Sequence, residues 1–382
     1  MIINSKKDFI NLLNSCSNKT FEIFSFGCRV NAAEINQLSE IFVENGFKKT
    51  NKASIFLVNT CAITKKGEVE SLSKIRVIQR QFPKAKIITT GCANFQKIPN
   101  IFYFNNKNKE KILDKLYAYY SPKIGDKYTP YRRFLLKVQS GCTQNCTYCI
   151  VPQKRPYLFS LPIDQAIQTI KKIEKDYDEI IITGVNLIQY KYGFSNLIKK
   201  ILEETNIKLI SFGSIPLNCI DNKFIQLLDN PRLSNFLHIP IQSGSSRILK
   251  LMHRPYDRKK IIETFKKIKN SVAPLSKGAT PLGGAEGFDF GTDVIVGFPT
   301  ETKKDFNDTL NLCTKIGFKK IHTFRYSPRP NTEAQKLFEN SEKINSEELK
   351  KRSFLIRNLT SQTKLPSHQK LDKKKKPLAL QI

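Results

Sequence analysis

Three closely spaced cysteines carry the clearest chemical signature of this sequence. Cys142, Cys146 and Cys149 form a C-x3-C-x2-C arrangement. Three thiolates on one short loop can bind three irons of a cubane iron–sulfur cluster, which leaves the fourth iron open to a small molecule. A tetrahedral zinc site would need a fourth ligand nearby, and no histidine lies between the N-terminus and His238. The spacing favours an iron–sulfur cluster over zinc, with three unrelated core cysteines as the remaining alternative.

A second set of cysteines is spread along the first hundred residues. Cys28, Cys61 and Cys92 each follow, within three residues, an apolar run that predicts a β-strand. Because the carboxyl ends of parallel strands share one edge of a sheet, we expect these cysteines to converge and hold a second iron–sulfur cluster. Scattered core cysteines are the alternative. The other three cysteines have no such context and are expected to be ordinary thiols: Cys16, Cys219 and Cys313.

The elements that position the cysteines follow an alternating pattern of strands and helices. Apolar runs at 21–26, 54–58 and 86–90 predict strands, and helical periodicity at 32–44 and 69–81 predicts the helices between them. This pattern indicates an α/β fold that begins with a doubly wound parallel-sheet domain. We place that domain at residues 1–122, followed by a linker that is rich in proline, glycine and tyrosine.

The second part of the chain repeats the pattern from residue 134 to 324. Six strand–helix units indicate an open, partial (β/α)6 barrel, placed at residues 123–345. The first of these strands ends just before Cys142, where α/β folds place their chemistry. We expect a glycine-rich insert at 274–287. The remainder, 346–382, is expected to be a basic helical segment with a disordered lysine-rich tail.

The composition limits the classes of molecule that this protein is expected to bind. Lysine and arginine total 64 against 33 acidic residues, for a formal charge of +31, which favours a polyanionic partner such as RNA over a neutral one. A lysine-rich composition without function is the alternative. The sequence shows no secretory signal and no apolar run of about 20 residues that could span a membrane. We expect a cytoplasmic protein with no membrane association, in which clustered cysteines bind metal and do not form disulfides.

The motifs together resemble one enzyme family. The loop around Cys142, with Tyr148 before its last cysteine, resembles the signature of radical S-adenosylmethionine (SAM) enzymes. With the phrases at 25–31, 58–64 and 90–92, it is similar to the radical SAM methylthiotransferases. The phrases Gly-Cys-Arg-Val-Asn and Asn-Thr-Cys-Ala-Ile-Thr resemble the branch that acts on threonylcarbamoyladenosine in tRNA. The isopentenyladenosine branch usually shows Gly-Cys-Gln-Met-Asn, and the branch for ribosomal protein S12 usually shows Gly-Cys-Pro-Lys-Asn.

The resemblance implies cofactors, partners and roles for particular residues. The cluster at Cys142, Cys146 and Cys149 would bind SAM and cleave it to a radical that removes hydrogen from C2 of the modified adenine. A second 4Fe-4S cluster at Cys28, Cys61 and Cys92 would hold or donate the sulfur. The implied partners are tRNA and an electron donor such as flavodoxin or ferredoxin, and a monomer is expected. Residues at the strand ends are expected to line the SAM pocket: Tyr148, Gly184, Asn186, Ser214, His238, Gln242 and Gly244. A hydrogen-bonded core histidine is the alternative for His238.

Several features depart from the family pattern. Arg155 is followed by proline where relatives have glycine, and the segment 211–217 lacks the usual arginine and glutamate. Family members usually end in a small β-barrel RNA-binding domain, and we expect no such domain from the pattern of this sequence. Ribosomal protein S12 or isopentenyladenosine tRNA as substrate, and a degenerate noncatalytic RNA-binding protein, therefore stay open.

Because we expect a polyanionic substrate, we also predict two basic surfaces on the protein. The threonylcarbamoyl carboxylate needs a polar, partly basic pocket, for which Arg325 and Arg329 are candidates, although solvated surface charges explain them equally well. A helix at 347–363 is expected to pack an apolar face against the barrel and to expose a basic ridge. The apolar face comprises Leu349, Phe354, Leu355 and Leu359, and the ridge comprises Lys350, Lys351, Arg352 and Arg357.

Overall fold

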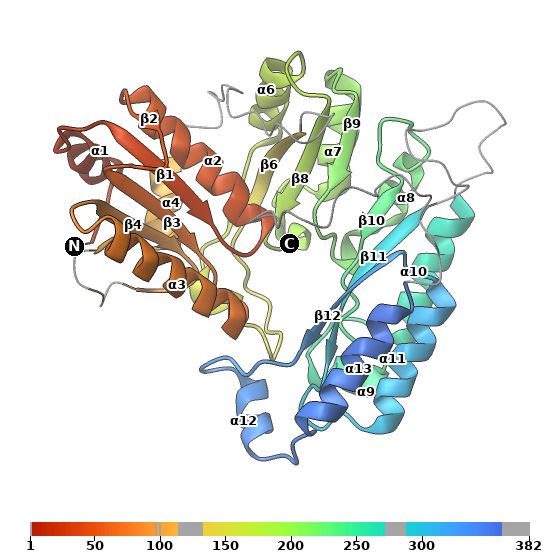
Figure 1. Ribbon diagram of the computed structural model, residues 1–382. Helices are drawn as coiled ribbons and strands as arrows, with labels where there is room; N and C mark the ends of the chain where they lie inside the picture. Colours follow the sequence, from red (N-terminus) through yellow and green to blue (C-terminus); the bar gives the residue numbers. More distant parts are fainter. Residues whose placement is uncertain (1, 96–97, 99–100, 114–132, 272–287, 361–382) are drawn as a thin grey trace, which may run out of the picture.

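The computed structural model describes residues 2–95, 98, 101–113, 133–271 and 288–360. Its N-terminal part contains a sheet of five parallel strands in the order β2-β1-β3-β4-β5, drawn in red to orange in Figure 1. The predicted doubly wound sheet is therefore confirmed. In spatial order the strands are β2 Lys48–Lys49, β1 Thr20–Ser25, β3 Ile55–Thr60, β4 Lys86–Gly91 and β5 Ile101–Tyr103.

Helices cover both faces of this sheet. Phe21, Leu57 and Ile88 point to one face, where they share a core with three helices. Phe56 and Ile87 point to the opposite face, where they pack against a fourth helix. Alternate residues of each strand thus serve two cores, as expected for a parallel sheet buried on both sides. The first three helices are α1 Lys6–Asn14, α2 Arg29–Glu44 and α4 Asn106–Leu113, and the fourth is α3 Lys65–Gln81.

The second part forms the predicted open barrel. Strands β6, β8 and β9 lie in one parallel sheet, whose outer edge carries the short antiparallel strand β7, and β10, β11 and β12 lie in another. Next to the break between these two sheets, Ile210 of β9 pairs with Leu233 just before β10, and Ser214 just after β9 pairs with His238 of β10. The strands are β6 Arg133–Ser140, β7 Phe159–Ser160, β8 Glu179–Gly184, β9 Leu209–Phe212, β10 Phe236–His238, β11 Asp289–Val296 and β12 Lys320–Arg325.

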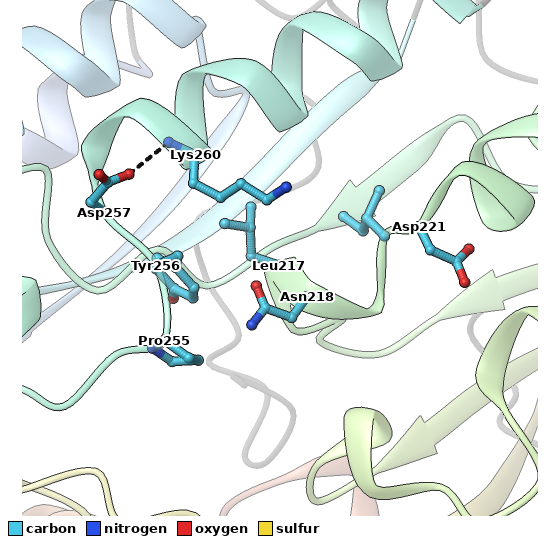
Figure 2. Close-up of a pocket in the computed structure, with 8 residues that line it drawn as sticks. Leu217, Asn218, Asp221, Pro255, Tyr256, Asp257 and Lys260 are labelled. Carbon is cyan, nitrogen blue, oxygen red and sulfur yellow. Dashed lines mark hydrogen bonds between the residues drawn. The ribbon is translucent and has the colours of Figure 1, made fainter.

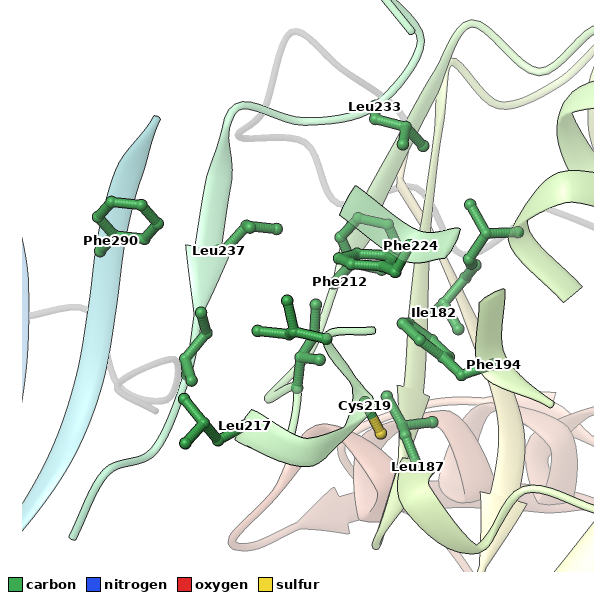
Figure 3. Close-up of a cluster of buried hydrophobic side chains, with 14 of the residues drawn as sticks. Ile182, Leu187, Phe194, Phe212, Leu217, Cys219, Phe224, Leu233, Leu237 and Phe290 are labelled. Atoms are coloured by element: carbon green, nitrogen blue, oxygen red, sulfur yellow. The ribbon is translucent and has the colours of Figure 1, made fainter. Parts of the chain in front are cut away.

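The outer face of the barrel holds the largest hydrophobic core. Figure 3 shows Phe194, Phe212 and Phe224 against each other, and their ring centroids lie 5.3 to 5.8 Å apart. Such aromatic pairs add to the stabilisation from buried apolar area. The helices around the barrel are α5 Val151–Lys154, α6 Ile163–Ile173, α7 Phe194–Glu204, α8 Asn222–Leu227, α9 Ser246–Leu251, α10 Arg258–Ser271 and α11 Lys303–Ile316, followed by α12 Glu333–Glu339 and α13 Ser346–Asn358.

The N-terminal domain packs against the inner face of the barrel at β6. Phe134, Leu136 and Val138 of β6 point outward into the large core, so Lys137 points inward. Helix α2 contacts β6 and β8, and Arg29 at its start donates to the carbonyl of Phe212 at 3.3 Å. Figure 1 shows α2 between the two sheets. Residues that look like a solvated helix face in the sequence are therefore buried between domains.

The prediction for the last helix is wrong for part of its packing face, although Leu359 packs against the large core and the predicted ridge residues Lys350, Lys351 and Arg357 are exposed. Phe354 and Leu355 of α13 are 60% and 38% exposed, whereas Arg352 is buried. Arg352 donates to the buried carboxylate of Glu301 at 2.8 Å and to Glu348 at 2.9 Å. These ion pairs make burial of the guanidinium tolerable and place Arg352 on the packed side of the helix.

Three predicted features fall outside the described residues: the linker near 121–131, the insert at 274–287 and the lysine-rich tail. Within the described residues, no helix is long and apolar enough to cross a membrane.

Candidate iron–sulfur active site

The first cysteine loop leaves β6 through a tight turn. Gly141 has a φ of +86°, and the Cys142 amide then donates to the carbonyl of Arg155 at 3.0 Å. Within the loop, the Cys149 amide donates to the carbonyl of Cys146 at 3.0 Å. These bonds close the loop and direct three sulfur atoms toward one region.

Polar groups surround the three sulfur atoms. Asn186 Nδ2 donates to Cys142 Sγ at 3.4 Å, and the Arg254 guanidinium approaches Cys146 Sγ at 3.6 Å. Backbone amides of Gln144 and Val151 donate to the sulfurs of Cys142 and Cys149. Such hydrogen bonds stabilise negative charge on sulfur, as a cluster of thiolate ligands requires.

Two of the three thiols resist ionisation in the absence of a bound cation. Burial, followed by the charges of the neighbouring cysteines, raises the pKa of Cys149 to about 12. Burial also raises the pKa of Cys142. Iron binding at Cys142 and Cys149 would therefore displace their protons, as is usual for thiolate sites. Three converging thiols with amide and guanidinium donors fit a three-cysteine iron–sulfur cluster.

Gly141→Ala is expected to disrupt this loop strongly. A Cβ at this position would lie 1.9 Å from the carbonyl oxygen of Tyr157, and the φ of +86° is unfavourable for alanine. We expect the variant to bind less than half of the iron of the first cluster, measured by iron analysis after reconstitution. Gly193→Ala is the matched control, because its φ is +78° but its Cβ would have space. Equal iron loss in both variants would show that backbone strain alone is responsible.

The structure places the residues predicted for the SAM pocket in different surroundings. Asn186 lies beside Cys142, and its amide donates to Gln139 at 2.7 Å. Tyr148 packs in a cluster with Ile295. Ser214 is exposed and pairs with His238 across the junction of the two sheets. These positions line the inner side and the carboxyl end of the barrel.

Glycines and a strained glutamine complete that set. Gly184 faces Gln139, where a Cβ would lie 3.0 Å from that side chain's Cβ. Gln242 has a φ of +67°, and its amide donates to the carbonyl of Asp293 at 2.9 Å. Gly244 instead packs on α11, where a Cβ would lie 2.6 Å from the Cα of Thr309. Close helix packing therefore explains the glycine at 244.

Arg254 connects the loop to an open pocket that the sequence did not reveal. Besides Cys146, the Arg254 guanidinium binds the hydroxyl of Tyr256 at 2.6 Å, and that hydroxyl donates to Pro240 at 3.1 Å. Tyr256 lines a pocket of 590 Å³, shown in Figure 2 with Asn218 and Lys260. One pocket residue, Tyr256, is therefore linked to the cysteine loop through Arg254.

The second set of cysteines also comes together. Cys28 is the N-cap of α2, Cys61 follows β3, and the Cys92 amide donates to the carbonyl of Thr60 at 3.0 Å. Burial, and then the charges of Cys92 and Cys28, raises the pKa of Cys61 to about 11. Gly27 leaves room for the Cys61 sulfur, which would lie 2.6 Å from a Cβ at that position. This donor set also fits a three-cysteine cluster.

A buried ion network joins the two cysteine sets. Arg155, six residues after Cys149, donates to both carboxylate oxygens of Glu34 at 2.7 and 2.9 Å and to the side chain of Asn31 at 2.7 Å. Glu34 and Asn31 lie in α2, directly after Cys28. Arg155 and Glu34 are 3% and 0% exposed. One guanidinium therefore links the loop of the first set to the helix of the second.

Two buried lysines complete the network. Lys109 forms an ion pair with Glu34, and Lys137 lies 3.3 Å from Glu34 and 2.9 Å from Glu110. Burial lowers the pKa of Lys109 to about 8, against the opposing charge of Glu34. Although burial opposes its charge, Glu34 and then Cys92 raise the pKa of Arg155. The network brings an excess of positive charge close to the second cysteine set.

The arginines considered for substrate binding have different positions. Arg329 is 5% exposed and forms an ion pair with Glu68 of α3 at 3.1 Å. That arginine therefore joins the two domains and is not available to a carboxylate in this arrangement. Arg325 is exposed at the end of β12.

Sequence comparisons divide the chain in the same way as the structure. Residues 20–111 match the uncharacterized protein family UPF0004, and residues 136–313 match the Radical SAM superfamily. The first segment contains Cys28, Cys61 and Cys92, and the second contains the C-x3-C-x2-C loop.

Individual relatives align over most of the chain. The threonylcarbamoyladenosine tRNA methylthiotransferase MtaB of Rickettsia prowazekii is 31% identical over 363 residues, which cover 87% of this chain and 82% of its own. The tRNA-2-methylthio-N(6)-dimethylallyladenosine synthase of Helicobacter acinonychis is 30% identical over 347 residues, which cover 82% and 76%. The two substrate branches are thus about equally similar to this chain.

A solved structure supports the fold. The radical S-adenosylmethionine methyltransferase TsrM of Kitasatospora setae superposes with a TM-score of 0.58 at 10% identity, over 83% of this chain and 77% of its own. At this identity the likeness concerns the fold alone.

Proposed function

This chain belongs to the radical SAM methylthiotransferase family, and from that membership we propose that it methylthiolates C2 of threonylcarbamoyladenosine next to the anticodon of tRNA. The main structural support is the Arg155–Glu34 link, which holds the two cysteine sets in one rigid arrangement. A reaction that needs a radical source and a sulfur source requires two such centres at a fixed separation.

The residues divide between the two centres. Cys142, Cys146 and Cys149 would hold the SAM-binding 4Fe-4S cluster, and Cys28, Cys61 and Cys92 would hold a second one. A cluster with bound SAM supplies the radical chemistry that an unactivated C–H bond requires, because acid–base groups cannot break that bond. Asn186 and Arg254 would orient the first centre through their bonds to its sulfurs. The inner face of the barrel would exclude water from the reacting groups.

The partners follow from charge and chemistry. A formal charge of +31 suits a tRNA substrate, whose phosphates attract lysine and arginine. The first cluster must receive electrons from outside the chain, and a flavodoxin or ferredoxin is of the right class. We expect tRNA affinity to fall steeply with added salt.

A reconstitution assay tests this function. The enzyme with both clusters, SAM and a reductant is expected to convert threonylcarbamoyladenosine in tRNA to its 2-methylthio derivative, detected by mass spectrometry of the nucleosides. tRNA that lacks the threonylcarbamoyl group is expected to be a poor substrate. Equal turnover of dimethylallyladenosine tRNA would show that the assignment to this branch is wrong.

A further inference from the structure

A polar cluster on the inner face of the barrel has no role in the chemistry described above. His238 Nε2 lies 2.9 Å from Asp293 Oδ1, and His322 Nδ1 lies 3.2 Å from the same oxygen. The two imidazole centroids are 5.3 Å apart. The three residues, here called the inner triad, come from the adjacent strands β10, β11 and β12.

The strand register places the inner triad on the side away from the outer helices. Phe290, Val294 and Ile321 point into the large core. Asp293 and His322 are paired residues of β11 and β12, and they alternate with those core positions, so both point inward. Gly291 gives His238 its space, because a Cβ there would lie 2.7 Å from the His238 Nδ1.

The same face leads to the first cysteine loop. Ile295 follows Asp293 by two residues and packs in one cluster with Tyr148 of that loop. Phe324 follows His322 by two residues and is 41% exposed. An exposed aromatic ring of this kind can stack on a nucleobase. The inner triad thus lies two residues along β11 from Ile295, which packs with Tyr148 of the loop that would hold the radical-generating cluster.

Two polar atoms of the inner triad remain available to a ligand. Across the described residues, Asp293 Oδ2 and His322 Nε2 have no hydrogen-bond partner. The side chains of Asp293 and His322 are 20% and 34% exposed. Burial opposes ionisation of Asp293, but hydrogen bonds from His238 and His322 lower its pKa to about 2. The cluster therefore offers an ionised acceptor beside an imidazole nitrogen.

We propose that the inner triad is the subsite that binds the polar substituent on N6 of the target adenosine, with Phe324 beside the base. This inference rests on the proposed function and deepens it. A threonylcarbamoyl group carries ureido N–H and hydroxyl donors, which Asp293 Oδ2 and the second ring nitrogen of His322 can accept.

The inner triad disfavours the alternative substituent. A dimethylallyl group is a hydrocarbon without donors or acceptors. Seating it on Asp293 and His322 would remove water from both side chains without replacing their hydrogen bonds. Sites built around hydrogen-bonding groups reject ligands that lack the matching partners much more strongly than apolar pockets reject extra groups. The inner triad therefore selects the threonylcarbamoyl branch.

The test measures binding without turnover. The protein with both clusters reconstituted is titrated with two anticodon stem-loop RNAs, one with threonylcarbamoyladenosine and one with unmodified adenosine. We expect the wild type to prefer the modified RNA by at least about tenfold, the effect of a hydrogen bond to a charged group. Asp293→Asn and His322→Gln are each expected to bind both RNAs about equally. Asp289→Asn, earlier on the same strand beside Lys319, is the matched control and should keep the preference.

The possible results separate this inference from the proposed function. A wild type that binds both RNAs equally, or variants that keep the preference, would overturn the subsite. Circular dichroism of the variants checks that they are folded, and His322→Gln is the milder change because the His322 side chain is partly exposed. A parallel methylthiolation assay with the wild type tests the reaction itself. If the preference depends on the inner triad but no methylthio product forms, the subsite is supported and the proposed reaction fails.

Discussion

Replacing Cys142, Cys146 and Cys149 together with alanine is expected to remove half of the bound iron and all SAM cleavage. Two cubane clusters would bring about eight irons to the wild type, and each three-cysteine set would account for half. The replacement of Cys28, Cys61 and Cys92 is expected to leave the other half of the iron and to preserve SAM cleavage. Methylthiolation is expected to be absent in both triple variants.

The three remaining buried cysteines supply the control. Cys16, Cys219 and Cys313 lie in hydrophobic surroundings, and they pack as small apolar side chains. Their combined replacement with alanine is expected to keep full iron content and both activities, with a modest loss of stability. Full iron content in either of the two other triple variants would contradict the ligand assignment. Iron and sulfide analysis, with SAM cleavage measured separately, reads out each result.

The positions of the cysteines could be predicted because two simple rules apply to them. Each follows a strand whose apolar residues are evident in the sequence, and parallel strands end at a common edge. The confirmed strands β1, β3, β4 and β6 therefore bring Cys28, Cys61, Cys92 and the loop at 142–149 to strand ends. Of the polar side chains beside the first loop, Asn186 was predicted because it follows β8, whereas Arg254 was not.

The buried network could not be predicted, because its members are far apart in the chain and look like surface charges. Glu34 and Arg155 are separated by 121 residues. Only the packing of α2 on the inner face of β6 buries them. One feature of the sequence pointed that way: Lys137 interrupts an otherwise apolar strand, and a charge within such a strand needs a buried partner.

The packing of Phe354 in α13 and the partners of His238 in the inner triad could not be predicted for a related reason. The helix spacing favoured Phe354 as a packed residue, but the pairing of Arg352 with Glu301 decides which face is buried. His238 was considered as a SAM-pocket residue or a core histidine, and its partners Asp293 and His322 became apparent only from the register of β10, β11 and β12. The register between two strands decides which of their side chains become neighbours. That register cannot be recognised in the sequence of either strand alone.

Glu34→Gln is expected to destabilise the protein more than any other single change in the interface between the domains. Glu34 is fully buried and contacts three cations, Arg155, Lys109 and Lys137. Removing its charge leaves Arg155 and Lys109 without a carboxylate partner in this buried network, whereas Lys137 keeps Glu110. Breaking a buried ion pair from one side typically costs about 3–5 kcal/mol. We expect a shift of this size in the denaturant unfolding of the protein before cluster reconstitution.

A double-mutant cycle separates the contribution of the Glu34–Arg155 ion pair to stability from the effect of changing any buried residue. Arg155→Gln alone is expected to be less harmful, because Lys109 and Lys137 still compensate Glu34. The double variant Glu34→Gln/Arg155→Gln is expected to be more stable than Glu34→Gln, since one uncompensated cation has been removed. Glu110→Gln is the matched control, because Glu110 contacts only Lys137 in this network and its side chain is 15% exposed, so its loss should cost about 1 kcal/mol.

The same variants connect stability to function. Because Arg155 and Glu34 join the loop after Cys149 to the helix after Cys28, loosening this link should disturb the separation of the two centres and leave each centre intact. We therefore expect the folded fraction of Glu34→Gln to cleave SAM at a near-normal rate but to lose most methylthiolation. Both activities are measured below the unfolding midpoint, per bound iron. A variant as stable as the wild type, or one that loses both activities in the same proportion, would show that the network does not set the arrangement of the two centres.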